Sequence, residues 1–118
     1  MAAGDIKWFQ QGLHDLGNKI HNLNGDALMV GIVNNTAPPA METVGPGWGA
    51  AGATNFSLNQ VGTGGGYTGP IALQNVTWTI VSGVPTLRAT DVSVPQSASG
   101  FSNGAYAIIY NDTDANKR

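Results

Sequence analysis

Two short apolar runs constrain the fold of this chain more than any other feature. They are residues 28–33 (LMVGIV) and residues 105–110 (AYAIIY). Turn-forming residues follow each run, Asn34-Asn35 in the first case and Asn111-Asp112 in the second. A short apolar run closed in this way predicts a β-strand that is buried on both faces. We therefore expect these two strands to form the middle of one sheet, with the rest of the chain laid over it.

The composition fits one domain, residues 1–118, with an unusually uncharged surface. Charged residues make up 10% of the chain, against the usual ~25%. Two interpretations stay open: the surface lies against other protein, or Ser, Thr, Asn and Gly keep it soluble without charge. There is no cysteine, the net charge is −2 and no basic run occurs. The sequence therefore predicts no disulfide and no direct nucleic-acid partner. No apolar stretch approaches the ~20 residues that span a bilayer, so no membrane partner is expected.

The N-terminal region, residues 5–23, has the apolar spacing of an amphipathic helix. Asp5 is a suitable N-cap, and apolar residues recur every three or four positions. Gly12 and Gly17 each cost roughly 1 kcal/mol in a helix interior, so docking must hold this helix. Its apolar face either covers the sheet or is presented to a partner or to copies around a symmetry axis. The stripe consists of Ile6, Phe9, Leu13, Leu16, Ile20 and Leu23.

Two long glycine-rich loops, residues 40–70 and 95–104, interrupt the β domain predicted over residues 27–118. Residues 55–59 alternate and indicate a short strand inside the first loop. A long loop in a compact domain is usually functional or ordered by a partner. Trp48 lies in this loop, where a large aromatic side chain either tucks onto the core or anchors an interface. We favour the tucked position, and Phe101 is the expected anchor of the second loop.

A β-hairpin is predicted over residues 73–80 and 87–92, with its turn at residues 82–85 (SGVP). Val76, Trp78 and Ile80 share one face of the first strand, which we expect to be the core face. The predicted fold is therefore mainly β, as a small antiparallel sandwich or partly open barrel with one N-terminal amphipathic helix.

No motif predicts catalysis, a cofactor or a metal site. His14 and His21 are seven residues apart, whereas zinc pairs on helices sit at i and i+4 and need further ligands. His14 beside Asp15 is not half of a triad, because adjacent helical residues are expected to point apart. Asp112 and Asp114 lack the glycine and glutamate of a calcium loop and are typical of a solvated turn. We predict that the protein is not an enzyme.

Three blocks of sequence carry a resemblance to a known group of proteins. They are residues 8–23, residues 26–38 and residues 86–92 leading to 106–113, with a Gly-Gly-Gly-Tyr-Thr turn at 64–68 between the second and the third. In these blocks the chain resembles small structural proteins found in tailed-bacteriophage genomes, some of which are capsid cement (decoration) proteins. The blocks span most of the chain, and each is short and degenerate.

This resemblance implies a binding function on the virion. It implies a capsid cement protein that stabilises the assembled shell, with the major capsid protein as partner, a homo-oligomer with a trimer favoured, and a place on the capsid surface after synthesis in the host cytoplasm. Two alternatives stay open: a receptor-binding or adhesive virion tip, and a tail-tube or connector subunit. The residues expected at interfaces are Trp48, Tyr67, Ile6, Phe9 and Leu13.

The end of the sequence departs from this resemblance, which implies further apolar strand residues after the turn at 111–113. Here Lys117-Arg118 are the last residues. If a strand is absent, one sheet edge is left open, and an open edge invites pairing with another chain.

Overall fold

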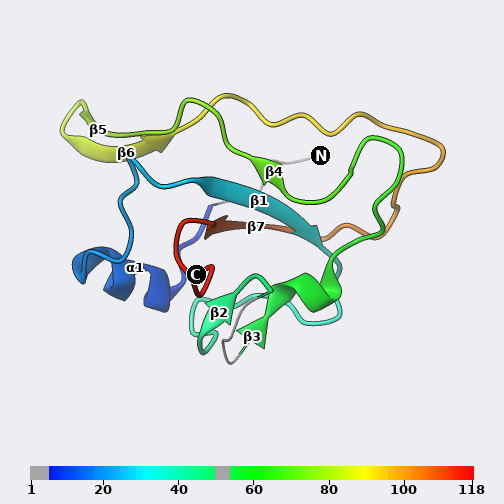
Figure 1. Cartoon of the computed structure of the whole chain (residues 1–118), viewed down its shortest axis with the longest axis horizontal. Coiled ribbons are helices and arrows are strands. Elements are labelled where there is room, and N and C mark those ends of the chain that lie inside the picture. Colours follow the sequence, from blue (N-terminus) through cyan, green and yellow to red (C-terminus); the bar gives the residue numbers. More distant parts are fainter. Residues whose placement is uncertain (1–5, 50–53) are drawn as a thin grey trace.

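The computed structural model describes residues 6–49 and 54–118. Most of its regular structure is strand, with one short helix (Figure 1). In chain order the elements are α1 (Gln10–Gly17), β1 (Leu28–Val33), β2 (Pro46–Gly47), β3 (Thr54–Asn55), the 3₁₀ helix η1 (Phe56–Asn59), β4 (Ile71–Ala72), β5 (Thr77–Val81), β6 (Val84–Arg88) and β7 (Tyr106–Asn111).

The two apolar runs pair as predicted. β1 is the central strand of an antiparallel sheet with the order β4-β1-β7, and Gly31 lies opposite Ile108. β5 and β6 form a second antiparallel pair, while β2 and β3 form a short parallel one. The prediction of a mainly β, antiparallel fold with one helix is confirmed. Within the described residues the strands do not close into a barrel.

The core lies on one face of the β1–β7 ladder, where Trp48 occupies the tucked position. Its ring stacks on Tyr110 with the centroids 5.2 Å apart and the planes at 4°. Gly31 makes this possible, because a Cβ there would lie 2.1 Å from the Trp48 ring. Phe56 and Val33 complete the buried cluster. Burial raises the pKa of the Tyr110 hydroxyl to about 12, since the charged phenolate is disfavoured away from water.

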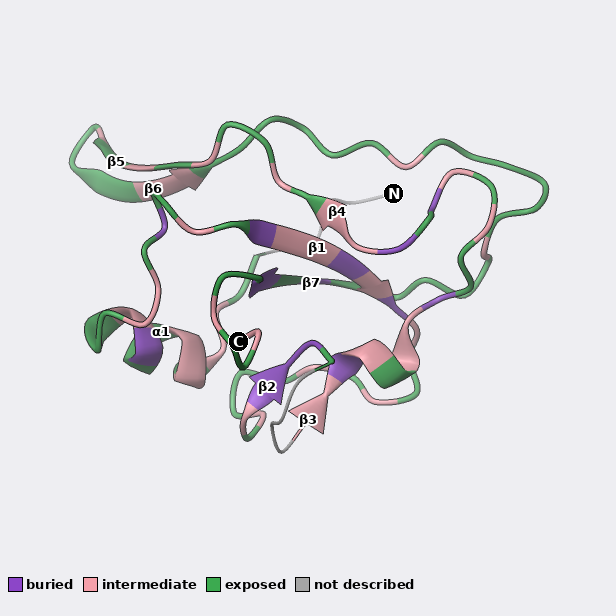
Figure 2. Cartoon of the chain, in the orientation of Figure 1, coloured by how far each residue is buried: buried purple, intermediate pink, exposed green. Residues whose placement is uncertain are grey.

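The prediction that both strands are buried on both faces is wrong for β7. Ala107 and Ile109, which share one face of β7, are exposed, while Ile108 and Tyr110 on the other face are buried. Figure 2 shows both buried and exposed stretches along β7. Side chains alternate between the two faces of a strand, and only the face toward Trp48 is covered. A continuous apolar run therefore does not guarantee two covered faces.

The helix is shorter than the predicted region 5–23. It begins after Phe9, whose side chain makes no cap, and the Gln10 N–H bonds instead to the Met41 carbonyl (2.9 Å). It ends in a Schellman turn, in which Lys19 adopts a φ of 62° and the Ile20 N–H bonds to the Asp15 carbonyl (2.9 Å). The predicted cap, Asp5, lies outside the described residues.

The hairpin forms with a tighter turn than predicted. Ser82 and Gly83 both have positive φ, as a two-residue type I′ turn requires. The predicted core face is wrong: Ile80 is 73% exposed, and Trp78 is half-buried. Trp78 is held by Asn24, whose side chain accepts from its backbone N–H (2.6 Å) and donates to its carbonyl (3.1 Å). The ring of Trp8 meets that of Trp78 edge-on, with centroids 6.5 Å apart.

The described parts of the glycine-rich segment, residues 40–49 and 54–70, hold more regular structure than their composition predicts, because β2, β3 and η1 lie within them. The expected strand at 55–59 is a strand only to Asn55 and continues as η1. Tyr67 is buried, and its hydroxyl donates to Gln60 Oε1 (3.0 Å) and accepts from the Ile32 N–H (3.2 Å). The Val61 N–H bonds to the Ile32 carbonyl (3.0 Å). These bonds satisfy backbone groups of β1 that lie beyond the end of the two-residue strand β4.

Candidate functional site

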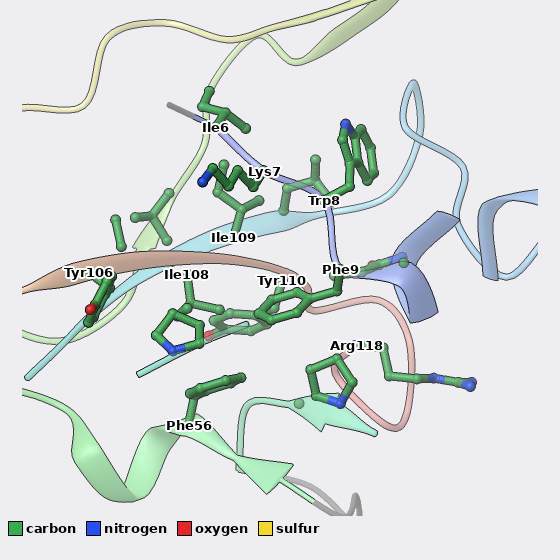
Figure 3. Close-up of a pocket in the computed structure, with 18 of the residues that line it drawn as sticks. Ile6, Lys7, Trp8, Phe9, Phe56, Tyr106, Ile108, Ile109, Tyr110 and Arg118 are labelled. Atoms are coloured by element: carbon green, nitrogen blue, oxygen red, sulfur yellow. The ribbon is translucent and has the colours of Figure 1, made fainter. Parts of the chain in front are cut away.

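An apolar groove, called here the β7 groove, runs along β7. It has a volume of about 880 Å³ and is lined by every residue from Ala105 to Asn111. The opposite lining comes from distant segments, including Ile6, Leu87 and Val92. Figure 3 shows Ile6, Lys7 and Trp8 on one side of β7, and Phe56 on the other. Volumes of 300–1,000 Å³ are typical of binding sites.

A buried polar cluster closes one end of the β7 groove. Asp15 on α1 is fully buried, and its Oδ1 accepts from Gln11 Nε2 (2.8 Å). Its Oδ2 has no hydrogen-bond partner among the described residues but lies 3.4 Å from Arg118 Nη1 and 4.0 Å from His21 Nε2. An isolated buried carboxylate is costly, so the guanidinium of Arg118 is the group that makes this burial tolerable.

Asn111 joins this cluster to the sheet. Its Nδ2 donates to His21 Nδ1 (3.0 Å) and to Asp26 Oδ2 (2.6 Å). Since Nδ1 of His21 accepts this bond, the ring's proton sits on Nε2, toward Asp15. The Asn111 backbone N–H bonds to the Arg118 carbonyl (2.8 Å). The side chain and backbone of one strand residue therefore fasten the segment before β1 and the C-terminal segment together.

The acidic turn after β7 is held by two ion pairs. Asp112 pairs with Lys117, and Asp114 Oδ2 accepts from Arg118 Nε at 3.0 Å. The hydrogen bond from Arg118 lowers the pKa of Asp114, and the same bond raises the pKa of the Arg118 guanidinium. Among the described residues no group of three or more His, Asp or Glu side chains is arranged to hold a metal ion. Both carboxylates serve the turn itself.

The two histidines meet the same carboxylate. His14 Nδ1 lies 3.2 Å from Asp15 Oδ1, so the expectation that these neighbours point apart is wrong. His14 is exposed and rotates back along the helix surface, where it also lies near Asn18. In the described part of the chain neither ring bonds to a serine or threonine hydroxyl. The two histidine rings therefore contact the Asp15 carboxylate, and neither is placed to activate a hydroxyl nucleophile in the described part of the chain.

The five residues expected at interfaces fall into two groups. Trp48 and Tyr67 are buried at 6% and 1% exposure, so an interface role for them stays a prediction that requires the core to open. Ile6 and Leu13 are exposed at 85% and 50%, and Phe9 is half-buried against Phe56. The structure brings Ile6 and Phe9 together in the β7 groove and leaves Leu13 outside it.

Large apolar side chains outside this groove are also exposed, and their exposure was not predicted. The clearest signal for them was the low content of charged residues, which leaves few positions to separate apolar ones. Four of these side chains are more than half exposed: Val44 (73%), Leu58 (81%), Ile80 (73%) and Val84 (60%).

Comparisons with known protein families, with curated proteins and with solved structures find no match to this chain. In the part of the chain that the structure describes, no helix has the length and apolar character needed to cross a membrane.

Proposed function

We propose that this chain is a capsid cement protein of a tailed bacteriophage, which binds and stabilises the assembled shell. The observation that carries the proposal is the set of exposed apolar side chains on a chain with 10% charged residues. When a partner covers side chains such as Ile80 and Val84, the complex is stabilised by roughly 25 cal/mol per Å² of buried apolar surface. The sequence resemblance supplies the identity of the partner, the major capsid protein.

The proposed mechanism is binding without catalysis. Copies bridge neighbouring capsid subunits on the virion surface and add buried area across joints that must resist the internal pressure of the DNA. A trimer around three-fold positions repeats one interface without loose ends. In this proposal the sandwich or partly open barrel is completed on assembly, when a neighbour covers the exposed face of the β1–β7 ladder.

An adhesive tip is the less favoured alternative. Such a tip would stack exposed rings, with Trp48 and Tyr67 as candidates, on a host glycan, and both rings are engaged in the core. A tail-tube or connector subunit uses the same kind of apolar contact and is separated from cement by stoichiometry.

The copy number of the chain in purified particles tests the proposal. We expect a ratio near one to one with the major capsid protein, measured by quantitative mass spectrometry. A handful of copies per particle would move the assignment to the tail or to a receptor-binding tip. Absence from the particles would overturn a virion function altogether.

A pair of variants then tests the surface that carries the proposal. Ile80→Ser combined with Val84→Ser should weaken binding to shells that lack the chain, while the melting temperature of the isolated protein stays unchanged because both side chains are exposed. Thr77→Ser with Thr79→Ser is the matched control on the same hairpin, since both side chains are exposed, and it should bind as the unmodified chain does. Equal binding by both double variants would show that the hairpin is not the contact.

A further inference from the structure

Alternate residues of β7 direct their backbone N–H and C=O groups toward β1 or away from it. Which residues point away is called here the phase of the ladder, and it can be read from the hydrogen bonds. Asp112 N donates to the Ala27 carbonyl (2.8 Å), which makes this a hydrogen-bonded pair at the end of the β1–β7 ladder. Hydrogen-bonded and non-hydrogen-bonded pairs alternate in an antiparallel ladder. Ile108 and Tyr110 therefore bond to β1, and the N–H and C=O groups of Ala107 and Ile109 point away from it.

Two further contacts confirm this phase. The Leu28 and Ile32 carbonyls accept from Leu73 and Val61, so both turn away from β7. At the other side of the ladder, the Asn111 N–H points outward and bonds to the Arg118 carbonyl (2.8 Å). Within residues 6–49 and 54–118, no partner is present for the outward groups of Ala107 and Ile109.

The β7 groove runs beside these unpaired groups. Its lining is mostly apolar and includes no carboxylate among the described residues. Of its three cations, Lys117 and Arg118 are already paired with Asp112 and Asp114, and Lys7 has no ion pair within the described part of the chain. Ala107 is exposed and small, and Ile109 is 40% exposed. A row of unpaired backbone groups beside an apolar groove is the arrangement that receives a peptide by strand addition.

We propose that the β7 groove receives an extended strand from a partner polypeptide, which pairs antiparallel with β7. The strand carries apolar side chains at alternate positions, to match the apolar lining, and is neutral or acidic, to match Lys7. The Arg118 carbonyl already occupies the first outward position, opposite Asn111. Counting on from that pairing, the residue two positions further along the added strand lies opposite Ile109, and the residue four positions further lies opposite Ala107.

A second copy of β7 fits this edge less well. Consider two copies of β7 that pair antiparallel around a two-fold axis, with the outward groups of both Ala107 and Ile109 bonded. In some registers, residue 103 or residue 105 of the copy then lies opposite Asn111. In the remaining register, Asn111 of the copy lies opposite Ala107. The first arrangement requires the position that Arg118 holds, and the second uses an Asn111 N–H that is already bonded. This is why we assign the groove to a different chain. The inference concerns backbone pairing alone and does not depend on the proposed virion function.

An added strand supplied through the C-terminus provides the first test. The full chain is extended after Arg118 by threonine-valine-threonine-valine-aspartate, which places the valines opposite Ile109 and Ala107. Amide hydrogen exchange is measured by NMR, with Ile108 and Tyr110 as internal references. We expect exchange at Ala107 and Ile109 to slow about tenfold or more relative to the chain extended by glycine-serine-glycine-serine-glycine.

Substitutions at Ala107 separate edge pairing from general stabilisation. Ala107→Pro removes an outward N–H that β1 does not use, so the fold should persist while the slowing at Ile109 is lost. Ala107→Ser keeps the N–H and should behave as the parent does. The same five-residue segment as a free peptide should protect the same two amides in the unextended chain, with the proline variant unresponsive.

Three outcomes would overturn the inference. One is protection of Ala107 and Ile109 equal to that of Ile108 in the unextended chain, which would mean that the edge is already paired. Another is no slowing by the valine-containing extension. The third is self-association of the unextended chain that Ala107→Pro abolishes, because it would identify a second copy as the occupant. Failure of the chain to bind capsids would leave all of these exchange results unchanged.

Discussion

The β1–β7 ladder and the β5–β6 hairpin are both antiparallel pairings of apolar-rich strands, yet only the first is buried. In the ladder, Val33 is 0% exposed and Ile108 is 6% exposed. In the hairpin, Ile80 and Val84 are 73% and 60% exposed. Figure 1 shows the hairpin at the same end of the molecule as α1, and away from β2, β3 and η1.

The difference lies in what covers each face rather than in the strands themselves. Gly31 leaves room on β1 for the Trp48 ring, and Tyr110 stacks on that ring from the neighbouring strand. The hairpin is held instead by two hydrogen bonds from the side chain of Asn24 and by an edge-on contact with the ring of Trp8. Apolar alternation therefore predicts that a strand forms, and the covering segment decides whether that strand becomes core.

The largest effect is expected from removing the ring that covers the sheet. Trp48→Ala should lower the free energy of unfolding by about 3–5 kcal/mol, as for other buried aromatic residues. Trp78→Ala, the matched change on the half-buried hairpin, should cost about 1 kcal/mol. Urea unfolding followed by circular dichroism measures both. Similar losses would show that the hairpin contributes to the core as much as the sheet does.

A methyl group at Gly31 should act on the same contact from the other side. Gly31→Ala places a Cβ in the Trp48 ring and should cost about 1–3 kcal/mol by overpacking. Gly62→Ala is the control, since nothing lies within 4 Å of a Cβ there and its φ is not positive. Thermal unfolding of the two variants should differ clearly, and an unchanged melting temperature for Gly31→Ala would contradict the packing described.

The attachment of the hairpin should depend on one side chain. Asn24→Ala removes two hydrogen bonds to Trp78, each with a net value of about 0.5–1.5 kcal/mol. Amide exchange should accelerate in β5 and β6 while the Ile108 amide stays protected. Asn35→Ala, at an exposed asparagine whose side chain has no hydrogen bond among the described residues, should change neither. Equal acceleration in both ladders would show that they unfold together.

Acid should loosen the C-terminal segment before it affects the hairpin. Arg118 lowers the pKa of Asp114 in the folded protein below the ordinary value of 3.8, so the folded state holds its proton less tightly than the unfolded state does. This stabilisation is present above that ordinary value and is lost as the pH falls through the lower, folded value. Asp114→Asn should flatten the acid limb of a melting-temperature profile, whereas Asp91→Asn should not. An unchanged limb for Asp114→Asn would place the acid sensitivity elsewhere.

The smallest effect is expected on the exposed face of the hairpin. Ile80→Thr should change the free energy of unfolding by no more than about 0.5 kcal/mol. Ile108→Thr makes the same chemical change in the buried ladder and should be far more costly, because it also buries a hydroxyl group. Denaturant midpoints for the pair give the comparison directly. A large loss for Ile80→Thr would mean that the hairpin is buried in solution.

The sequence predicted the features that local chemistry determines. The strands predicted at residues 28–33 and 105–110, a hairpin with its turn within residues 82–85 and the tucked Trp48 all follow from short apolar runs, turn formers and one large ring among glycines. The early end of the helix did not follow, because Lys19 takes a left-handed conformation that is far more common for glycine. That choice is made by the packing around the turn.

The polar cluster at the end of the β7 groove could not be predicted from the sequence, for a different reason. Asp15, Asn111 and Arg118 come from opposite ends of the chain, and each is ordinary in its local context. Only the tertiary fold brings them together and makes the burial of Asp15 possible. The exposed face of β7 was mispredicted because a run of apolar residues does not reveal how many faces a neighbour covers.

The hydroxyl of Tyr67 has a consequence for the stoichiometry of assembly. By bonding to the Ile32 N–H it occupies a position where another strand would otherwise continue β4 along β1. This side of β1 is therefore closed to a further strand, and the strand addition proposed above uses the β7 side. Endless stacking of molecules edge to edge requires two receptive edges per molecule. The other edge of the sheet is β4, which is only two residues long. We therefore expect strand addition at β7 to give complexes of defined size instead of fibres.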